Sequence, residues 1–488
     1  MEPIEVLRAH RRMKLEELRR RGVDPYPPRF PVDGRVSEVA ARFAAADAAT
    51  LEEAPPRVRV GGRVTAVRSH GKATFFDLAD GDGRLQVYGR RDVLGEEAFS
   101  LLENLDLGDF WGVEGLLFRT RTGELTVRAE RLTILAKALA PWPEKWHGLT
   151  NRETRARQRY LDLATNPESR RIFLARSAIV RELRAALDER GFVEVETPMM
   201  QPIPGGASAR PFVTHHNALD MDLYLRIAPE LYLKRLVAGG LERVYEINRS
   251  FRNEGISTHH NPEFTMLEFY WAFADYHDLM SFTEEMICRV AEKVTGGLQL
   301  AWGEHRLDLG RPWRRLSMRE AALAFGDLAP EELADRAGLE RNAAKLGIEN
   351  VSRLSGGKLL AEVFEATTEA HLLDPTFITD FPADISPLAK RRPDDPELTE
   401  RFELYLAGME LANAFTELND PDDQRRRFEE QVAAGGGVVD EDYLLALEHG
   451  LPPTAGEGIG IDRLVMVLTN SPSIRDVILF PLLRPQEG

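Results

Sequence analysis

The pattern of hydrophobic and polar positions divides the chain into stretches of different character. Helical patterns occupy residues 1–21 and 37–50, which Gly22 and a proline-rich segment separate. From residue 57 to 135 the apolar runs become short and rich in β-branched and aromatic residues, with turn residues between them. The five strands that we predict there cover residues 57–67, 73–79, 84–89, 110–119 and 124–135. A helical segment at 94–102 separates the third strand from the fourth, an order typical of an OB-fold barrel that binds single-stranded nucleic acid.

The sequence from residue 161 onward predicts one large α+β domain. Its first helix, 170–190, leads into a strand at 192–200. Two later strands, 243–248 and 263–273, flank a polar loop and predict a long hairpin. The domains that we expect are an N-terminal helical arm (1–56), an OB-fold domain (57–140), a linker (141–160) and the α+β domain (161–488) with an insertion at about 296–357.

The second strand of the hairpin carries an ionisable group on an apolar face. Side chains alternate along a strand, so Phe264, Met266, Glu268 and Tyr270 share one face. Arg252, at the loop end of the first strand, is within reach of that face. A structural ion pair between Arg252 and Glu268 would explain both residues. The alternative is a functional site, because buried charges cluster at such sites.

A later apolar stretch, from residue 402 to 420, also contains several polar groups. Glu403, Asn413 and Glu417 share one face under a period of two, whereas Glu410 is out of phase. If all four act together, the strand must contain a β-bulge near Gly408 or between Glu410 and Asn413.

Three further positions combine an unusual residue with its place in an element. Glycines at 456, 458 and 460 precede a helix whose first turn contains Arg463, where the helix macrodipole disfavours a cation. Arg463 is therefore a candidate for binding a ligand. Glu230 begins another predicted helix, where helix-dipole complementation alone would explain it. Gly206, in the loop after residue 202, allows a close approach of the backbone to a ligand.

Composition and charge limit the class of protein. The chain has 488 residues, is 43% hydrophobic and 29% charged, and contains no run of the roughly 20 apolar residues that cross a membrane. Cys288 is its only cysteine, so an intramolecular disulfide is excluded, and we expect a packed thiol in a reducing cytoplasm. The adjacent histidine pairs lack the context of a zinc site, and 355–358 lacks the first glycine of a phosphate-binding Walker loop.

The net charge of −16 argues against nucleic acid only weakly, because binding needs a local basic face. The first helix has seven positive residues against four acidic ones. It is either a solvated helix or a basic arm that contacts phosphates. The seven are Arg8, Arg11, Arg12, Lys14, Arg19, Arg20 and Arg21.

The hairpin loop carries the sequence S-F-R-N-E-G-I-S-T-H-H-N-P-E-F-T, from Ser250 to Thr265. This segment resembles motif 2 of the class II aminoacyl-tRNA synthetases, and its wording is closest to the lysine enzymes. The segment 455–469 is similar to motif 3 of the same family, and the helix and strand at 170–200 resemble motif 1, which builds the dimer interface. The resemblance implies a homodimer, an antiparallel sheet of about six strands flanked by helices, and two reaction steps. Lysine and ATP first form lysyl-adenylate and pyrophosphate, and the lysyl group then passes to the 3′ end of tRNA(Lys).

The resemblance also implies roles for individual residues. Arg252 and Arg463 would be catalytic, through the α-phosphate and the γ-phosphate of ATP. The residues expected at ATP are Arg252, Glu254, His260, Asn261, Phe264, Gly460 and Arg463. Those expected at lysine are Gly206, Glu230, Glu268, Tyr270, Asn413 and Glu417, with Glu268 and Tyr270 at the side-chain ammonium. Glu403 and Glu410 would hold Mg²⁺, which binds carboxylate and phosphate oxygens. Arg68, Phe75, Gln86 and Glu124 would read the anticodon.

Three other functions compete with this hypothesis. A paralogue that attaches a lysine-like amino acid to a protein would lack the barrel at 57–135. A nucleic-acid-binding protein with an inactive synthetase domain would not need Arg252, Arg463, Glu403 and Glu410. An aspartate or asparagine ligase would place a cation, not carboxylates, at the side-chain end of the amino-acid pocket.

Overall fold

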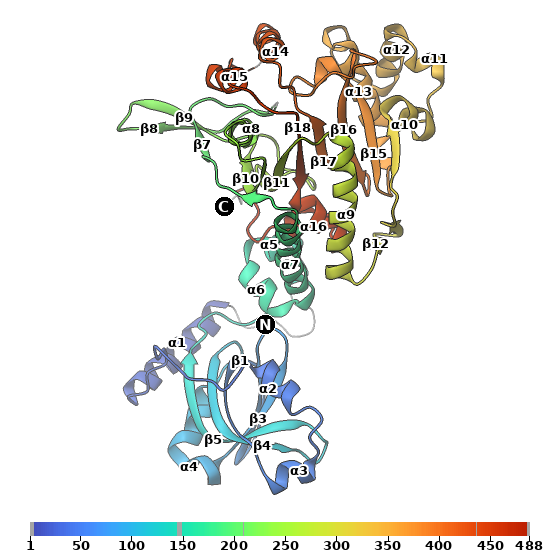
Figure 1. The fold of residues 1–488 in the computed structure, drawn as a ribbon. Coiled ribbons are helices and arrows are strands. Elements are labelled where there is room, and N and C mark those ends of the chain that lie inside the picture. The colour runs from blue at the N-terminus through green and yellow to red at the C-terminus, as the bar shows by residue number, and fades with distance from the viewer. Residues whose placement is uncertain (1–3, 144–148, 208, 436, 486–488) are drawn as a thin grey trace. The chain divides into compact units, whose positions relative to one another are not determined.

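The computed structural model describes residues 4–143, 149–207, 209–435 and 437–485. The chain forms two compact units, Met1–Arg170 and Arg171–Gly488, each with a hydrophobic core of its own (Figure 1). The division falls ten residues after the boundary that the sequence predicts at 160, inside helix α7 (Pro167–Glu189). Residues 144–148 of the predicted linker lie outside the described residues.

The N-terminal unit contains the predicted closed barrel, in the order β1-β2-β3-β5-β4. Alternating side chains fill it, since Val58, Val60 and Val64 of β1 are all buried. A helix and a 3₁₀ turn, α4 (Arg91–Ser100) and η1 (Leu101–Asn104), lie between β3 and β4 as expected. The strands are β1 (Arg57–His70), β2 (Ala73–Ala79), β3 (Arg84–Arg90), β4 (Phe110–Arg119) and β5 (Leu125–Ala136). The prediction of an OB-fold is confirmed.

Short helices surround the barrel. The prediction of one helix over 37–50 is wrong: the structure has α2 (Val36–Arg42) and α3 (Ala48–Glu53) instead. The break occurs because the side chain of Asp47 accepts a hydrogen bond from the backbone N–H of Thr50 at 2.7 Å and so begins a new helix. The other helices of this unit are α1 (Ile4–Arg20), α5 (Arg152–Arg157) and α6 (Arg159–Thr165).

The larger unit is built on a sheet of eight strands, in the order β14-β15-β16-β17-β18-β11-β10-β6 (Figure 1). The six central strands are antiparallel, as the family resemblance implies, and each edge adds one short parallel strand. In sheet order the strands are β14 (Arg314–Ser317), β15 (Thr376–Pro382), β16 (Leu398–Leu406), β17 (Met409–Thr416), β18 (Thr454–Gly460), β11 (Glu263–Ala272), β10 (Arg243–Phe251) and β6 (Val193–Glu194).

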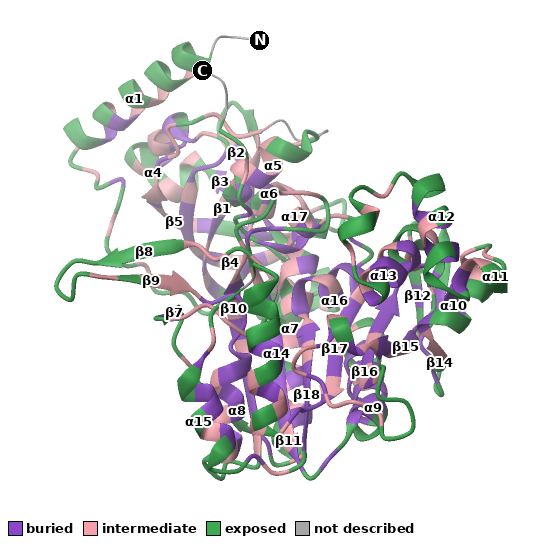
Figure 2. Ribbon diagram, turned by 90° about the horizontal axis from the view of Figure 1, so that it is seen from above, coloured by how far each residue is buried: buried purple, intermediate pink, exposed green. Residues whose placement is uncertain are grey.

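The strand predicted at 192–200 is mostly wrong. Only Val193 and Glu194 pair with the main sheet, in parallel with β10. Pro198 lacks a backbone donor, and the chain leaves the sheet before it. A separate small sheet then forms from β7 (Met200–Gln201), β9 (Met221–Leu225) and β8 (Val213–His216). The β8–β9 hairpin is largely exposed (Figure 2).

One face of the main sheet packs against the largest core. Helix α9 (Tyr276–Thr295) crosses β16, β17 and β18, and α16 (Ile461–Leu468) packs beside it. Cys288 of α9 is a buried thiol, as predicted, and donates to the carbonyl of Leu309 at 3.1 Å. The remaining helices outside the insertion are α8 (Glu230–Ala238), α14 (Pro421–Ala433), α15 (Glu441–Glu448) and α17 (Ile474–Val477). The opposite face of the sheet is left for the site.

The region predicted as an insertion has two parts. Its first part forms β12 (Gln299–Trp302), β13 (His305–Asp308) and the edge strand β14 of the main sheet. The second part packs on the main sheet in a core cluster that joins Leu339, Leu359 and Phe364 to Ile378 of β15 and Tyr405 of β16. Its helices are α10 (Met318–Phe325), α11 (Pro330–Leu333), α12 (Arg336–Leu346) and α13 (Gly356–Thr367). Within the described ranges, no helix combines the length and the apolar composition that a membrane crossing requires.

Candidate active site

The predicted site residues of the larger unit form a row across four neighbouring strands. Glu268 of β11 lies opposite Gly458 of β18, which lies opposite Asn413 of β17, which in turn lies opposite Glu403 of β16. Residues opposite each other in a sheet present their side chains on the same face. Neighbouring strands lie ~4.8 Å apart, so the row runs for ~14 Å from Glu268 to Glu403.

The glycines of β18 form the floor of this row. Gly456, Gly458 and Gly460 alternate along the strand, so all three face the site. A Cβ on Gly456 would lie 2.3 Å from Glu417 Oε1 and 2.4 Å from a ring carbon of Tyr270. The side chains of the flanking strands therefore converge over a strand that contributes none of its own.

A β-bulge brings Glu410 onto the site face. Leu404 pairs with Ala412 and Tyr405 pairs with Glu410, so Leu411 has no opposite residue on β16. The extra residue restores the phase, and Glu410 then faces the same side as Asn413 and Glu403. This is the second of the two positions at which the sequence requires a bulge, and the prediction is confirmed.

Three carboxylates and a phenol lie buried at the β11 end of the row. Glu268 accepts a hydrogen bond from the hydroxyl of Tyr270 at 3.3 Å. Burial, together with the charges of Glu230 and Glu246, raises the pKa of Glu268 to about 8. Glu417 is also buried, and burial raises its pKa. The structure thus brings together Glu230, Glu268, Tyr270 and Glu417.

Gly206 lies beside this group of carboxylates. Its φ of +84° is favourable only for glycine, and an added Cβ would lie 3.1 Å from the Cβ of Glu230. Asn413 is placed further along the row and accepts a hydrogen bond from Arg401 Nε at 3.1 Å. The ion pair between Arg252 and Glu268 does not occur in the described part of the chain, although the two are close enough for Arg252 to lower the pKa of Glu268.

Two cations of the site, Arg252 and Arg463, lie at the loop that joins β10 to β11. The guanidinium of Arg252 stacks over the ring of Phe264 at 5.1 Å, and its buried Nε has no hydrogen-bond partner among the described residues. Arg463, in the first turn of α16 as predicted, donates to the carbonyl of Glu410 and lies 3.5 Å from both Glu410 Oε2 and His260 Nε2. Burial and the charge of Arg463 lower the pKa of His260.

The remaining predicted ATP residues have different surroundings. Asn261 is buried and holds the loop in place, because it donates to the carbonyl of Glu263 at 2.5 Å and accepts from the N–H of Leu482 at 3.2 Å. Glu254 is exposed in the loop, and its negative charge acts to raise the pKa of the His260 imidazole. Gly460 is the N-cap of α16 and lies directly before the helix that carries Arg463.

The predicted metal residues, Glu403 and Glu410, lie diagonally across β16 and β17, because Glu403 is opposite Asn413 and Glu410 is opposite Tyr405. Burial and then the charge of Glu410 raise the pKa of Glu403 to about 7. Glu403 accepts hydrogen bonds from Arg401 at 2.6 Å and from the hydroxyl of Tyr405 at 2.7 Å. In the part of the chain that the structure describes, no three Asp, Glu, His or Cys side chains converge as a metal site. The repulsion between two carboxylates is what a divalent cation would relieve, and the pair fits Mg²⁺ that also binds phosphate oxygens.

Sequence reasoning missed two charged residues of the site. Arg401 lies two positions before Glu403 on the same strand face, and it bridges Glu403 and Asn413. Lys234 lies one helical turn after Glu230 on α8 and pairs with it. The i,i+2 spacing in a strand and the i,i+4 spacing in a helix were available as signals.

On the barrel, three of the four predicted anticodon residues lie on three neighbouring strands, β1, β2 and β3. Phe75 is half-buried and its ring stacks on Tyr88 at 4.4 Å, whereas Phe76 points into the core, as alternation requires. Arg68 lies opposite Phe75, and Gln86 shares a strand face with Tyr88. The ring of Phe118 lies 6.1 Å from that of Tyr88. Tyr88 and Phe118, which the sequence analysis did not select, extend the aromatic surface.

The fourth residue, Glu124, lies just before β5 and is 3.1 Å from Arg84, whose other nitrogen pairs with Asp77. Arg68 also lies 3.7 Å from Asp77. Gln86 accepts a hydrogen bond from the hydroxyl of Thr126 at 3.0 Å, so its amide nitrogen is the group left for a ligand. Polar groups therefore border the aromatic surface.

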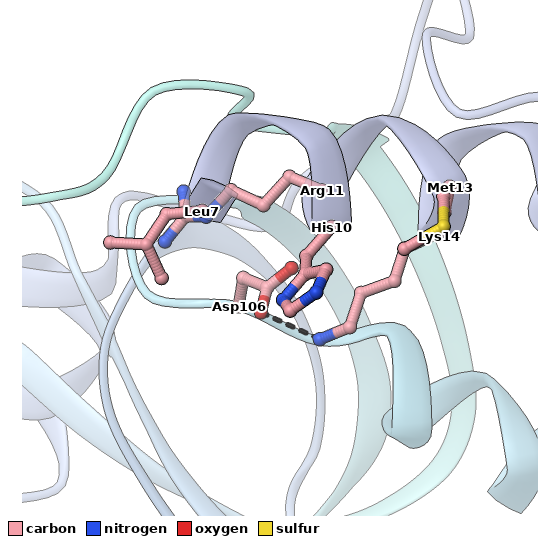
Figure 3. Close-up of a pocket in the computed structure, with 6 residues that line it drawn as sticks. All are labelled: Leu7, His10, Arg11, Met13, Lys14 and Asp106. Atoms are coloured by element: carbon pink, nitrogen blue, oxygen red, sulfur yellow. Dashed lines mark hydrogen bonds and ion pairs between the residues drawn. The ribbon is translucent and has the colours of Figure 1, made fainter. Parts of the chain in front are cut away.

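Part of the basic character of α1 is used to hold that helix on the barrel. Lys14 pairs with Asp106 at 2.7 Å, beside a cavity of about 330 Å³ that Leu7, His10, Arg11 and Met13 also line (Figure 3). Arg11 donates to the carbonyls of Leu107, Ala138 and Ala140 at 2.7–3.0 Å. This cavity contains none of the predicted site residues.

Comparisons with known proteins agree with this geometry. Residues 151–484 match the family model of class II tRNA synthetases for D, K and N, and residues 58–135 match the OB-fold nucleic acid binding domain. The lysine–tRNA ligase of Moorella thermoacetica is 54% identical over 99% of this chain and 98% of its own length. That of Carboxydothermus hydrogenoformans is 52% identical over 97% of this chain and 97% of its own length. That of Pelotomaculum thermopropionicum is 54% identical over 98% of this chain and 94% of its own length. The chain therefore belongs to the class II tRNA synthetases and, within them, to the lysine–tRNA ligase family.

Proposed function

We propose that this chain is a lysine–tRNA ligase, which activates L-lysine with ATP and transfers it to tRNA(Lys). The observation that carries the proposal is the single row of side chains across β11, β18, β17 and β16. One end of the row offers buried carboxylates to a cationic amino acid. Arg252 and Arg463 offer positive charge to the phosphates of ATP.

The first step needs positioning and charge neutralisation more than proton transfer, because the attacking group is already a carboxylate. A carboxylate oxygen of lysine attacks the α-phosphorus, a new P–O bond forms, and the bond to the β-phosphate oxygen breaks as pyrophosphate leaves. Arg252 would contact the carboxylate and the α-phosphate together, since its Nε is buried and lacks a partner among the described side chains. Arg463 would bind the γ-phosphate.

Glu403 and Glu410 would hold Mg²⁺, which supplies charge neutralisation at the phosphates when it is bound. For this, Glu403 must be ionised, and Arg401 favours that form through its hydrogen bond at 2.6 Å. Phe264 would stack on adenine, with His260 and Asn261 beside it, and Glu254 and Gly460 at the rim. The guanidinium of Arg252 already lies over the Phe264 ring and connects the adenine and α-phosphate positions.

The choice of amino acid follows from the charges at the other end. Lysine presents a side-chain ammonium with three donors, so the pocket needs acceptors and negative charge. Glu268 and Tyr270 supply both, while Glu230 and Asn413 would hold the α-amino and carboxylate groups. Gly206 lines the wall and Glu417 closes the site. An aspartate would place its side-chain carboxylate beside the carboxylate of Glu268.

In the second step the terminal ribose hydroxyl of tRNA attacks the lysyl carbonyl carbon, and AMP leaves. The barrel would bind the anticodon through Phe75, with Arg68, Gln86 and Glu124 around it. Base stacking on aromatic rings is a general way to bind single strands. We place the enzyme in the cytoplasm, where tRNA is charged.

A homodimer fits the surface of the larger unit. Val193, Met199, Met200, Val213 and Leu219 are exposed apolar side chains around β6 and the β8–β9 hairpin. Large apolar groups that gather near a short sheet edge are typical of an interface. Light scattering on Met200→Asp should show a loss of dimer, and a parent protein that is monomeric at micromolar concentration would refute this part of the proposal.

The test of the function is ATP–pyrophosphate exchange driven by each standard amino acid. We expect lysine to support the fastest exchange, and exchange that depends on Mg²⁺. Exchange driven best by aspartate, or by no amino acid, would refute the proposal. Aminoacylation of tRNA(Lys) in the same preparation then tests the second step.

A further inference from the structure

Lys234 places a positive charge inside the pocket that should receive lysine. Its side chain is fully buried, and its Nζ lies 2.5 Å from Glu230 Oε1 and pairs with Glu417 Oε2. Its ammonium group also lies over the rings of Phe415 and Tyr443, with Nζ 5.2 Å and 6.0 Å from their centres. Burying an ammonium group costs several kcal/mol unless it is well paired, so a residue that only filled space here would be apolar.

The charged groups of the pocket balance those of a lysine substrate. When all three are ionised around a bound substrate, Glu230, Glu268 and Glu417 supply three negative charges, and Lys234 neutralises one of them, which leaves two. A lysine substrate carries two ammonium groups and one carboxylate. The two ammonium groups match the two remaining charges, and Arg252 matches the substrate carboxylate. Without Lys234 the pocket would have an excess of one negative charge.

The two carboxylates that pair with Lys234 each keep one oxygen for another partner. Glu417 Oε1 is buried and accepts no hydrogen bond from any described residue. It points over Gly456 beside Tyr270, because a Cβ on that glycine would lie 2.3 Å from it. On Glu230, the ion pair with Lys234 uses Oε1 and leaves Oε2.

We propose that Lys234 is a positioning residue that determines specificity in the proposed lysine activation. Its ammonium group fixes one oxygen of Glu230 and one of Glu417, so that the other oxygens are presented, ionised, to the two ammonium groups of the substrate. The amino-acid pocket thereby requires a substrate with two cationic groups. The inference depends on the proposed function, which it deepens.

The alternative is that Lys234 only ties α8 to the end of β17. The two roles predict different pH behaviour. Around Lys234 lie Glu230 and Arg235 of α8, Glu268 and Tyr270 of β11, Glu417 beyond β17, and Tyr443 of α15. Glu268, with a pKa of about 8, already binds a proton near neutral pH in the parent; if the cation is removed, repulsion among the three carboxylates keeps a further one protonated there. The substrate must then displace that proton, so lysine binds more tightly as the pH rises.

The experiment compares Lys234→Met with Lys234→Gln, which still donates hydrogen bonds but lacks the charge. Arg235→Met is the matched control, since it removes a cation from the same helix that pairs with Asp440, outside the pocket. Lysine-dependent pyrophosphate exchange is measured from pH 6.5 to 9, with thermal unfolding to show that each variant is folded. Relative to the parent at the same pH, we expect the KM for lysine of both Lys234 variants to rise about tenfold or more at pH 7 and to recover by at least about threefold at pH 9. The KM for ATP should stay within about twofold.

Several outcomes would overturn the inference. They are an unchanged KM for lysine in both variants, a parallel rise in the KM values for lysine and ATP, and a raised KM for lysine that does not vary with pH. If Lys234→Met fails to fold, Lys234→Gln alone decides, and Lys234→Arg should restore the KM of the parent at pH 7. If the parent protein itself shows no exchange with lysine, the proposed function fails, which is a distinct result.

Discussion

Glu457 is a carboxylic acid buried in the main core, on the face of β18 opposite the site. Its Oε2 accepts a hydrogen bond from the hydroxyl of Thr283 on α9 at 2.6 Å, and its Oε1 has no hydrogen-bond partner among the described residues. Burial raises the pKa of Glu457 from its ordinary value of 4.5 to about 8, against the opposing effect of the Thr283 hydrogen bond. We predict that this group makes folding less stable as the pH rises.

The sign follows from proton binding. The folded protein keeps the proton on Glu457 up to about pH 8, whereas the unfolded chain loses it near pH 4.5. The folded state therefore binds more protons in this window, and the free energy of unfolding falls as the pH rises through it. From pH 5 to pH 8 the change is about 4 kcal/mol, at about 1.4 kcal/mol per pH unit. Above pH 8 both states are ionised and the loss is complete.

Glu457→Gln removes the titration and keeps the shape. Urea unfolding followed by tryptophan fluorescence measures the free energy of unfolding. Between pH 5 and pH 8 that of the variant should increase by up to about 4 kcal/mol relative to that of the parent. Glu441→Gln is the control, because Glu441 is an exposed carboxylate whose pKa the Arg425 side chain lowers, so its titration lies below this window. If the difference in free energy of unfolding between Glu457→Gln and the parent is the same at pH 5 and pH 8, the reasoning is refuted.

Three further substitutions test separate parts of the site. Glu268→Gln should raise the KM for lysine about tenfold or more and leave the KM for ATP little changed, because it removes a counter-charge from the ammonium; equal changes in both would contradict the assignment. Arg463→Ala should do the reverse in pyrophosphate exchange, with a KM for ATP raised at least about tenfold by the loss of a charged phosphate contact. Phe75→Ala should weaken tRNA binding by about 1–3 kcal/mol, measured as KM for tRNA in aminoacylation, with unaltered exchange; a matching loss of exchange would argue against an anticodon role.

The elements that the sequence predicts best are those whose pattern is local. Strand β2 has the predicted bounds because Phe76 and Leu78 alternate with outward-facing side chains and turn residues flank the strand. The bulge at Leu411 is predictable for a related reason, since Glu410 is out of phase with residues of similar chemistry. In both, the deciding information lies within a few positions in the sequence.

The errors arise where a distant partner decides. The segment after Phe192 has the composition of a strand, yet only two of its residues find a place beside β10 at the edge of the sheet. Alanines 44–46 favour a helix, but the Asp47 cap begins a new one. Lys234 and Arg401 were missed because each also pairs with a group from another element. Lys234 pairs with the carboxylate of Glu417, and Arg401 donates to the amide oxygen of Asn413. Periodicity places such residues on a face and does not identify what lies opposite.

The spacing of the glycines in β18 explains why this sheet can hold an amino acid at all. Strands β11 and β17 are separated by β18, so their backbones lie ~10 Å apart. Side chains on β18 would normally fill that gap. With glycines at 456, 458 and 460, β18 places no side chain in that gap, so that Tyr270 and Glu417 reach over Gly456, and the alternate residues Ala455, Glu457 and Ile459 remain free to pack into the core. A pleated strand repeats every two residues, so any other spacing would direct side chains into the pocket. The site therefore depends on the absence of side chains from this face of β18, across which Glu268, Tyr270 and Glu417 can contact a substrate.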